Sequence, residues 1–129
     1  AEARRVTLLV EATNRYESAV ANRLEEAVEL IRDFRNSYLR ILPDTFHMNI
    51  EESDLYASLR LFSPYYCSLH VSDNNRLYPG LGGLDFKRLF HFLKKMGFRG
   101  GIAIEGNVKE SVVDDLRKSM RCLAPLLKY

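Results

Sequence analysis

The nine residues Asp44-Thr-Phe-His-Met-Asn-Ile-Glu-Glu52 decide the fold, and they follow directly on an apolar run from Tyr38 to Pro43. The stretch brings a carboxylate, an imidazole and an amide together within six residues, Asp44 to Asn49. A strand that ends in such a polar cluster is typical of parallel α/β folds, which carry their chemistry at the carboxyl ends of the strands. We therefore expect a strand over 38–43 with functional side chains after it.

Three further apolar runs end in the same way. They are Arg5–Val10, Tyr66–Leu69 and Gly101–Ile104, and the polar residues that follow them are Glu11, His70 and Glu105. Each run is short and rich in aliphatic or aromatic residues, and a segment with helical periodicity follows it, which predicts repeated βα units. The predicted fold class is α/β, with four parallel βα units.

The first and last helices are predicted from two capping boxes, formed by Asn22 with Glu25 and by Asn107 with Glu110. Their inward faces are predicted from apolar residues at helical spacing. These residues are Leu24, Ala27, Val28, Ile31 and Phe34 in the first helix, and Val113, Leu116, Met120 and Leu123 in the last.

Two more helices are predicted between them. A short one covers 54–62, and a longer one begins after the capping residue Asp85 and ends at Gly97, since glycine suits the left-handed turn that closes a helix. A loop from Ser72 to Leu84 precedes the longer helix. The inward residues of that helix are expected to be Phe86, Leu89, Phe90 and Leu93.

Length and composition limit the possible classes of protein. A chain of 129 residues without linkers predicts a single domain over 1–129, and no apolar run approaches the ~20 residues that span a bilayer, so no membrane partner is expected. A net charge of +2 on scattered basic residues argues against nucleic acid as a partner. Cys67 and Cys122 match no redox or zinc motif, and we expect buried free thiols in a cytoplasmic protein.

Glu11, Asp44, His70 and Glu105 are the candidate metal ligands. The carboxyl ends of adjacent parallel strands share one rim, where three carboxylates would repel one another unless a cation neutralised them. Hard oxygen ligands with one nitrogen suit Mn²⁺, Co²⁺ or Mg²⁺ better than a structural zinc. The alternative for each single position is that the carboxylate caps the next helix, or that the histidine is satisfied in the core.

The residues of four motifs resemble those of a known family. Glu11-x-x-Asn-Arg-Tyr-Glu17, the stretch 44–52, His70-Val-Ser-Asp-Asn-Asn-Arg76 with its following glycines, and Ile104-Glu105 resemble the C-terminal half of the xylose isomerase-like TIM barrels. Within that superfamily they are most similar to ketose 3-epimerases of the tagatose and psicose epimerase type. The resemblance implies one divalent metal ion held by Glu11, Asp44, His70 and Glu105, and sugar hydroxyls bound by Glu17, His47 and Arg76.

The resemblance also implies an activity and a partner. Glu11 and Glu105 are expected to be the catalytic pair, which removes a proton from carbon 3 of a ketose and returns one on the opposite face through an enediolate. Four βα units are half of a (β/α)₈ barrel of typically ~250 residues. We therefore expect either a missing N-terminal half-barrel or a homo-oligomer that closes the barrel.

Other interpretations stay open at this point. Glu17 fits the first turn of a helix, His47 fits a metal ligand or a loop residue packed on Phe46, and Arg76 fits a surface partner of Asp73. The alternative functions are a hydroxypyruvate isomerase, an inosose dehydratase-like enzyme, an abasic-site endonuclease or a noncatalytic half-barrel fragment.

Overall fold

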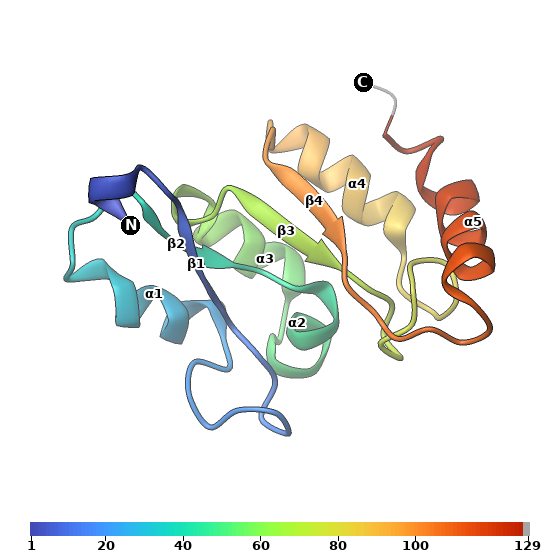
Figure 1. The fold of residues 1–129 in the computed structure, drawn as a ribbon, viewed down its shortest axis with the longest axis horizontal. Coiled ribbons are helices and arrows are strands. Elements are labelled where there is room, and N and C mark those ends of the chain that lie inside the picture. The colour runs from blue at the N-terminus through green and yellow to red at the C-terminus, as the bar shows by residue number, and fades with distance from the viewer. Residues whose placement is uncertain (128–129) are drawn as a thin grey trace.

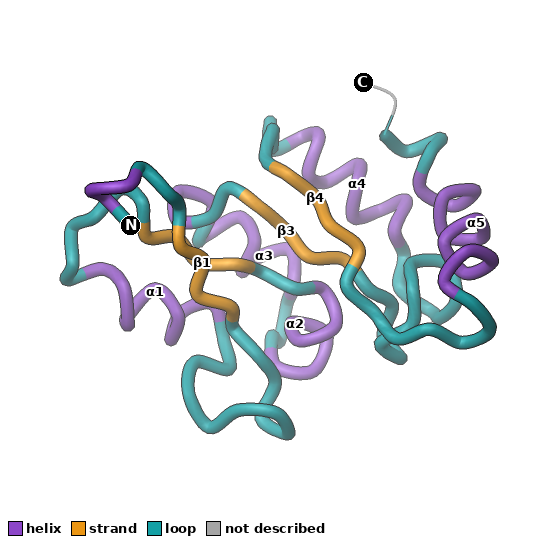
Figure 2. Tube along the Cα trace, in the orientation of Figure 1, coloured by secondary structure: helices purple, strands orange, loops and turns teal. Residues whose placement is uncertain are grey.

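The computed structural model describes residues 1–127 as short parallel strands that alternate with helices (Figures 1 and 2). The strands are β1 (Leu8–Glu11), β2 (Leu39–Leu42), β3 (Ser68–Val71) and β4 (Gly101–Ile104). The α-helices are α1 (Leu24–Arg32), α2 (Thr45–Glu51), α3 (Leu55–Leu61), α4 (Phe86–Lys95) and α5 (Val112–Leu123), and the 3₁₀ turns are η1 (Glu2–Arg4) and η2 (Ser63–Tyr65).

The strands pair in parallel as β1 with β2 and β3 with β4. Single parallel bridges join the two pairs, between Ile41 and Tyr66 and between Asp44 and His70. The His70 N–H also donates to the Pro43 carbonyl, 2.9 Å away, so the proline lies just beyond β2 and acts there as an acceptor. All the strands therefore point their carboxyl ends to one rim, and the predicted parallel α/β arrangement is confirmed.

One face of the strands packs on the helices and forms the core. Ile41, Leu69 and Val71 are fully buried there, against helix residues such as Leu24 and Leu89. Successive side chains of a strand point to opposite faces. The opposite face carries exposed residues, among them Leu9, Gly101 and Ala103. Leu42 on this face is buried, so the second face is open to solvent in part.

The helix predicted after Asp85 is confirmed in detail. The Asp85 side chain caps α4 by accepting the Arg88 N–H at 2.8 Å, and Gly97 adopts the left-handed conformation with φ of 74°. Its four predicted inward residues, Phe86, Leu89, Phe90 and Leu93, are all buried. The short helix over 54–62 is also confirmed, because Asp54 caps α3.

The capping box predicted for the first helix is wrong by one residue. The Asn22 N–H donates to Glu26, not Glu25, at 2.8 Å. The first residue of α1, Leu24, donates its N–H to the Glu52 carboxylate at 2.8 Å, so an acceptor from a distant segment sets the start of the helix. The helix ends at Arg32, and Phe34 lies beyond it, 70% exposed, instead of facing inward.

The last helix differs more. Ser111 caps α5 by accepting the Asp114 N–H at 3.1 Å, so the predicted box of Asn107 with Glu110 is wrong. The Asp115 carboxylate is buried and accepts the N–H groups of Lys109 and Glu110, which turns its side of the helix inward. As a result Leu123 is the one predicted apolar residue that is buried, whereas Val113, Leu116 and Met120 are exposed.

Helix α2, which begins directly after Asp44, was not expected as a separate helix.

The two cysteines are less buried than expected. Cys67 is exposed and Cys122 is half-buried, so the expectation of buried thiols is wrong. Cys67 precedes the first residue of β3 and lies outside the buried part of that strand. Within residues 1–127, every helix is too short or too polar to cross a membrane.

Candidate functional site

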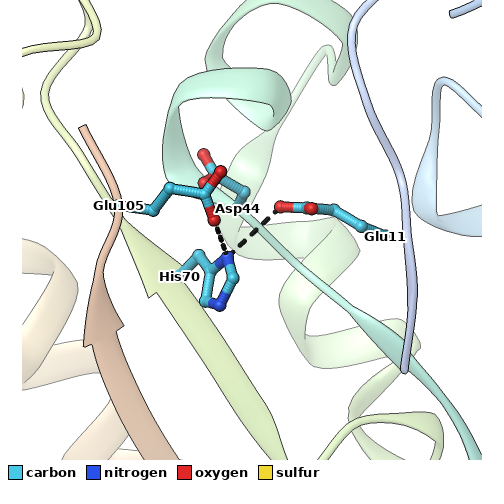
Figure 3. Close-up of side chains that lie close together, drawn as sticks. All are labelled: Glu11, Asp44, His70 and Glu105. Carbon is cyan, nitrogen blue, oxygen red and sulfur yellow. Dashed lines mark ion pairs between the residues drawn. The ribbon is translucent and has the colours of Figure 1, made fainter. Parts of the chain in front are cut away.

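Glu11, Asp44, His70 and Glu105 meet at the carboxyl ends of the strands (Figure 3). Glu11 ends β1, Asp44 lies two residues after β2, His70 is in β3, and Glu105 follows β4 directly. One ligand atom of each side chain lies within 4.8 Å of those of the other three. Residues far apart in the sequence are thus brought into one cluster by strand pairing.

The contacts within this cluster suit a shared cation better than a hydrogen-bond network. His70 Nδ1 lies 3.3 Å from Glu11 Oε1 and also contacts Glu105 Oε2. Yet three buried atoms, Glu11 Oε1, Asp44 Oδ2 and His70 Nδ1, have no hydrogen-bond partner among the described residues. Buried polar atoms normally have a partner. Atoms that crowd together without hydrogen-bond geometry fit ligands that converge on a metal ion, and this donor set fits one hard divalent ion.

The electrostatics of the carboxylates point the same way. Burial raises the pKa of Glu11, and repulsion by the charges of Glu105 and Asp44 raises it further. Burial also raises the pKa of Asp44, against the opposing effect of its hydrogen bonds and nearby cations. Both ionised groups are therefore held in a place that disfavours negative charge, and a bound cation would relieve this.

Asp44 has two functions in this geometry. Its Oδ1 atom caps α2 by accepting the N–H of Phe46 at 2.7 Å and of His47 at 3.3 Å. Its Oδ2 atom is left facing the cluster. The helix-cap interpretation and the metal-ligand interpretation of this residue are therefore compatible.

A second cluster lies beside the first and contains the predicted sugar-binding residues Glu17, His47 and Arg76. Arg76 Nη1 lies 2.8 Å from His47 Nε2 and 3.9 Å from Glu17 Oε1, and Arg76 Nη2 lies 3.2 Å from Glu105 Oε1. Arg76 thus connects the two clusters. Its guanidinium also stacks over the Phe46 ring, 4.8 Å from the ring centroid.

His47 is buried on α2 and not on a loop. Burial lowers the pKa of His47, against the opposing charge of Asp44, and the Arg76 cation lowers it further, so the neutral ring is favoured. It contacts Phe46 edge to face, with ring centroids 5.4 Å apart. It lies outside the group of possible metal ligands, so the interpretation of His47 as a ligand gains no support from the geometry.

Arg76 does not pair with the Asp73 side chain. The Asp73 carboxylate is buried and turned into the loop, where it accepts the N–H groups of Gly80, Gly82 and Leu84. Arg76 has a left-handed backbone with φ of 64°, and its side chain is 19% exposed. The surface-pair interpretation of Arg76 is therefore wrong, because the loop is folded around Asp73 and turns Arg76 toward the rim.

Sequence reasoning missed Asn14, the residue that joins these side chains. Asn14 is 1% exposed, and its amide contacts both Glu17 and His47. His47 is 33 positions away in the sequence, so no local pattern indicates this contact. The one signal was its place in the motif that runs from Glu11 to Glu17.

A family model described as the xylose isomerase-like TIM barrel matches residues 1–126. The chain belongs to this family. Among its curated relatives, a D-psicose 3-epimerase of Enterocloster bolteae is 35% identical over 100 residues, which are 78% of this chain and 33% of that protein. An L-ribulose 3-epimerase of Mesorhizobium japonicum is 32% identical over 118 residues, which are 92% of this chain and 40% of that protein.

A solved structure of a related enzyme agrees with this family assignment. The crystal structure of a 3-keto-D-glucoside 4-epimerase from Escherichia coli, in its apo form, superposes with a TM-score of 0.83 at 32% identity. The match covers 93% of this chain and 45% of that protein. The chain therefore spans less than half the length of these three relatives, and each of the three is named as an epimerase.

Proposed function

We propose that this chain carries the metal centre and part of the sugar pocket of a divalent-metal-dependent ketose 3-epimerase. The observation that carries the proposal is the convergence of Glu11, Asp44, His70 and Glu105 within 4.8 Å at one rim of the strands. The relatives named as 3-epimerases of psicose and ribulose support the sugar chemistry. A 4-epimerase among the matched structures makes the reacting carbon the point that most needs an experiment.

The four side chains would hold one ion of Mn²⁺, Co²⁺ or Mg²⁺. Three carboxylates and one imidazole suit these ions because hard cations prefer oxygen ligands. When bound, the ion supplies positive charge that stabilises negative charge developing on the sugar oxygens. The raised pKa values of Glu11 and Asp44 agree with a site whose charge is balanced only in the metal-bound protein.

Glu11 and Glu105 are the proposed catalytic residues. They approach His70 from opposite sides in the cluster, one from the first strand and one after the last (Figure 3). Inversion of a carbon requires removal of its proton on one face and delivery of a proton on the other. One carboxylate takes the proton from carbon 3, the electron pair passes into the neighbouring carbonyl as an enediolate, and the other carboxylic acid returns a proton to the opposite face.

Glu17, His47 and Arg76 are the proposed sugar-binding residues. Arg76 offers a planar fork of N–H donors and has no role as a base, since a guanidinium stays protonated. Its Nη2 atom already contacts Glu105, so a sugar oxygen bound by Arg76 would lie next to the proposed catalytic carboxylate. Loss of these donors would weaken binding and orientation of the sugar and not the chemistry of proton transfer itself.

We further propose that residues 1–129 form one domain equivalent to the C-terminal half of a (β/α)₈ barrel, completed by an N-terminal half-barrel or by a second copy. The solvent-exposed strand face, with Leu9 at 39% exposure, and the exposed apolar residues of α5 support this. Parallel sheets are almost always covered on both faces, and open strand edges recruit partners. Glu105 is 39% exposed in its side chain, so a covering half would also enclose the rim.

Epimerisation in D₂O tests the proposed function. The protein, loaded with Mg²⁺, is incubated with D-psicose or L-ribulose, and the products are analysed by NMR and mass spectrometry. The proposal predicts the C3 epimer with solvent deuterium at carbon 3, and a loss of turnover of ~10² to 10⁴ in Glu11→Gln or Glu105→Gln. A 3-keto-D-glucoside incubated in parallel tests the alternative, because its carbon 4 lies next to the carbonyl; deuterium at that carbon, with the 2-ketoses left unchanged, would indicate a 4-epimerase instead. Metal binding without any turnover would indicate a noncatalytic fragment.

A further inference from the structure

Asn14 surrounds one nitrogen of His47 with hydrogen-bond donors. The Asn14 backbone N–H donates to His47 Nδ1 at 3.1 Å, and the Asn14 Nδ2 atom lies 2.8 Å from the same nitrogen. Both contacts are buried. A backbone N–H can only donate, so Nδ1 must accept and carries no proton.

The orientation of the Asn14 amide follows from its other two partners. Its Oδ1 atom accepts the Tyr16 N–H at 2.9 Å, and its Nδ2 atom donates to Glu17 Oε1 at 2.9 Å. A flipped amide would place NH₂ against the Tyr16 N–H and a carbonyl oxygen against the Glu17 carboxylate, which loses both bonds. The amide therefore presents its NH₂ group to His47 and to Glu17 at once.

The other nitrogen of His47 then carries the proton. A neutral imidazole has one N–H, and with Nδ1 accepting from Asn14 that N–H lies at Nε2. Nε2 faces Arg76 Nη1 at 2.8 Å, and a guanidinium has donors but no acceptor. Two donors thus face each other beside the candidate metal centre, an arrangement that an oxygen acceptor lying against both would satisfy.

We propose that Asn14 is a positioning residue, which fixes His47 as the Nε2–H tautomer so that His47 and Arg76 donate together to one oxygen of the bound sugar. The use of this oxygen rests on the proposed function, whereas the tautomer is a property of the free protein. Asn14 also holds Glu17 in place through the same amide. One buried side chain thus orients two of the three proposed sugar-binding residues.

The competing role for Asn14 is purely structural. Its Oδ1 bond to the Tyr16 N–H and its own carbonyl, which accepts the N–H groups of Glu17 and Ser18, shape the turn after β1. Aspartate is isosteric with asparagine and retains all of these turn bonds. It lacks the NH₂ group and would present a carboxylate to His47 Nδ1. Asn14→Asp therefore separates the two roles.

Long-range ¹H–¹⁵N correlation spectra of the histidine rings test the proposal without any sugar. The metal-free protein contains His47, His70 and His91, and the variants His70→Gln and His91→Gln assign the signals by elimination. Wild type is expected to show His47 with a bare Nδ1 and a protonated Nε2. Asn14→Asp keeps the backbone N–H but places a carboxylate beside Nδ1 in place of the NH₂ donor, and it is expected to shift the population of His47 toward the Nδ1–H tautomer. Asn22→Asp is the matched control, because Asn22 braces the same loop through the carbonyls of Thr13 and Ser18 without touching His47.

Each outcome of this experiment decides the proposal. A protonated Nδ1 in wild type overturns it, and so does an unchanged His47 spectrum in a folded Asn14→Asp protein. The wild-type spectrum alone is sufficient if Asn14→Asp fails to fold. Where the protein turns over sugar, Asn14→Asp should lower kcat/KM by about 10- to 100-fold, as loss of a group that orients a functional histidine does, and Asn22→Asp should not. Absence of turnover would count against the proposed function and leave the tautomer result valid.

Discussion

The Asp73 Oδ2 atom accepts the N–H of Gly82, 2.9 Å away, and this bond closes the loop that carries Arg76. A Cβ atom on Gly82 would lie 2.5 Å from Asp73 Oδ1 and 2.6 Å from Asn74 Oδ1, closer than any real Cβ contact. A Cβ atom on Gly83, the next residue, would lie at an ordinary van der Waals distance of 3.7 Å from the Asn74 side chain. The loop therefore depends on one glycine of the two.

The first prediction concerns this pair of glycines. Gly82→Ala should lower the free energy of unfolding by about 1–3 kcal/mol, since an extra carbon is forced into a filled space. It should also weaken sugar binding, because the loop orients Arg76. Gly83→Ala is the control and should stay within about 0.5 kcal/mol of wild type. Urea denaturation measures the free energy of unfolding of both variants. Equal destabilisation by the two changes would contradict the described loop.

The second prediction concerns the charge on Glu11. Because burial and the neighbouring carboxylates raise its folded-state pKa above its unfolded value, the metal-free protein binds protons on folding at this group. The stability of the metal-free protein should therefore fall as the pH rises from the unfolded-state pKa of Glu11 to its raised folded-state pKa. Glu11→Gln removes the charge that destabilises the folded state. If the free energy of unfolding rises by ~1 kcal/mol, the melting temperature of the metal-free protein near pH 7 should rise by roughly 3–5 °C.

Glu25→Gln, on the exposed side of α1, is the control for this measurement and should leave the pH dependence of the melting temperature unchanged. Thermal scans in chelator between pH 4 and 8 provide the comparison. A lower melting temperature of Glu11→Gln at neutral pH would show that the carboxylate stabilises the metal-free fold, against the electrostatic account of the cluster.

The third prediction concerns association. The chain as given should form dimers or larger species at micromolar concentration, since its open strand face and the exposed side of α5 leave apolar surface uncovered. Leu116→Gln should weaken this association, whereas Arg117→Gln, at the adjacent exposed position, should not. Light scattering measures the mass of each variant. A monomer that unfolds cooperatively would contradict the need for a covering half.

The elements that local patterns determine could be predicted from the sequence. Asp85 and Gly97 bracket α4 with side-chain and backbone preferences of their own, so its bounds and inward face were foreseen correctly. The start of α1 depends on Glu52, and the inward side of α5 depends on the bonds of Asp115 to the preceding loop. The spacing of apolar residues contains no information about such polar tertiary contacts. The prediction from this spacing therefore chose the wrong inward face of α5.

The candidate site also has one part that strand pairing determines and another part that depends on how the loops fold. Positions at the ends of parallel strands necessarily share a rim, so the meeting of Glu11, Asp44, His70 and Glu105 followed from strand order alone. The contact of Asn14 with His47 and the left-handed backbone of Arg76 depend on how two loops fold, which no spacing rule reveals. The metal-binding role of the four residues stays a prediction.

Calorimetric titration of the metal-free protein with Mn²⁺ tests the central claim most directly. Asp44 and Asp54 both cap a helix with Oδ1, but Asp44 alone of these two belongs to the four-residue cluster. Wild type and Asp54→Asn should bind one ion per chain. Asp44→Asn, which keeps its helix cap, and His70→Gln should lose more affinity than the roughly 10–100-fold that follows loss of an outer-shell partner. Equal Mn²⁺ binding by wild type, Asp44→Asn and His70→Gln would contradict the metal centre.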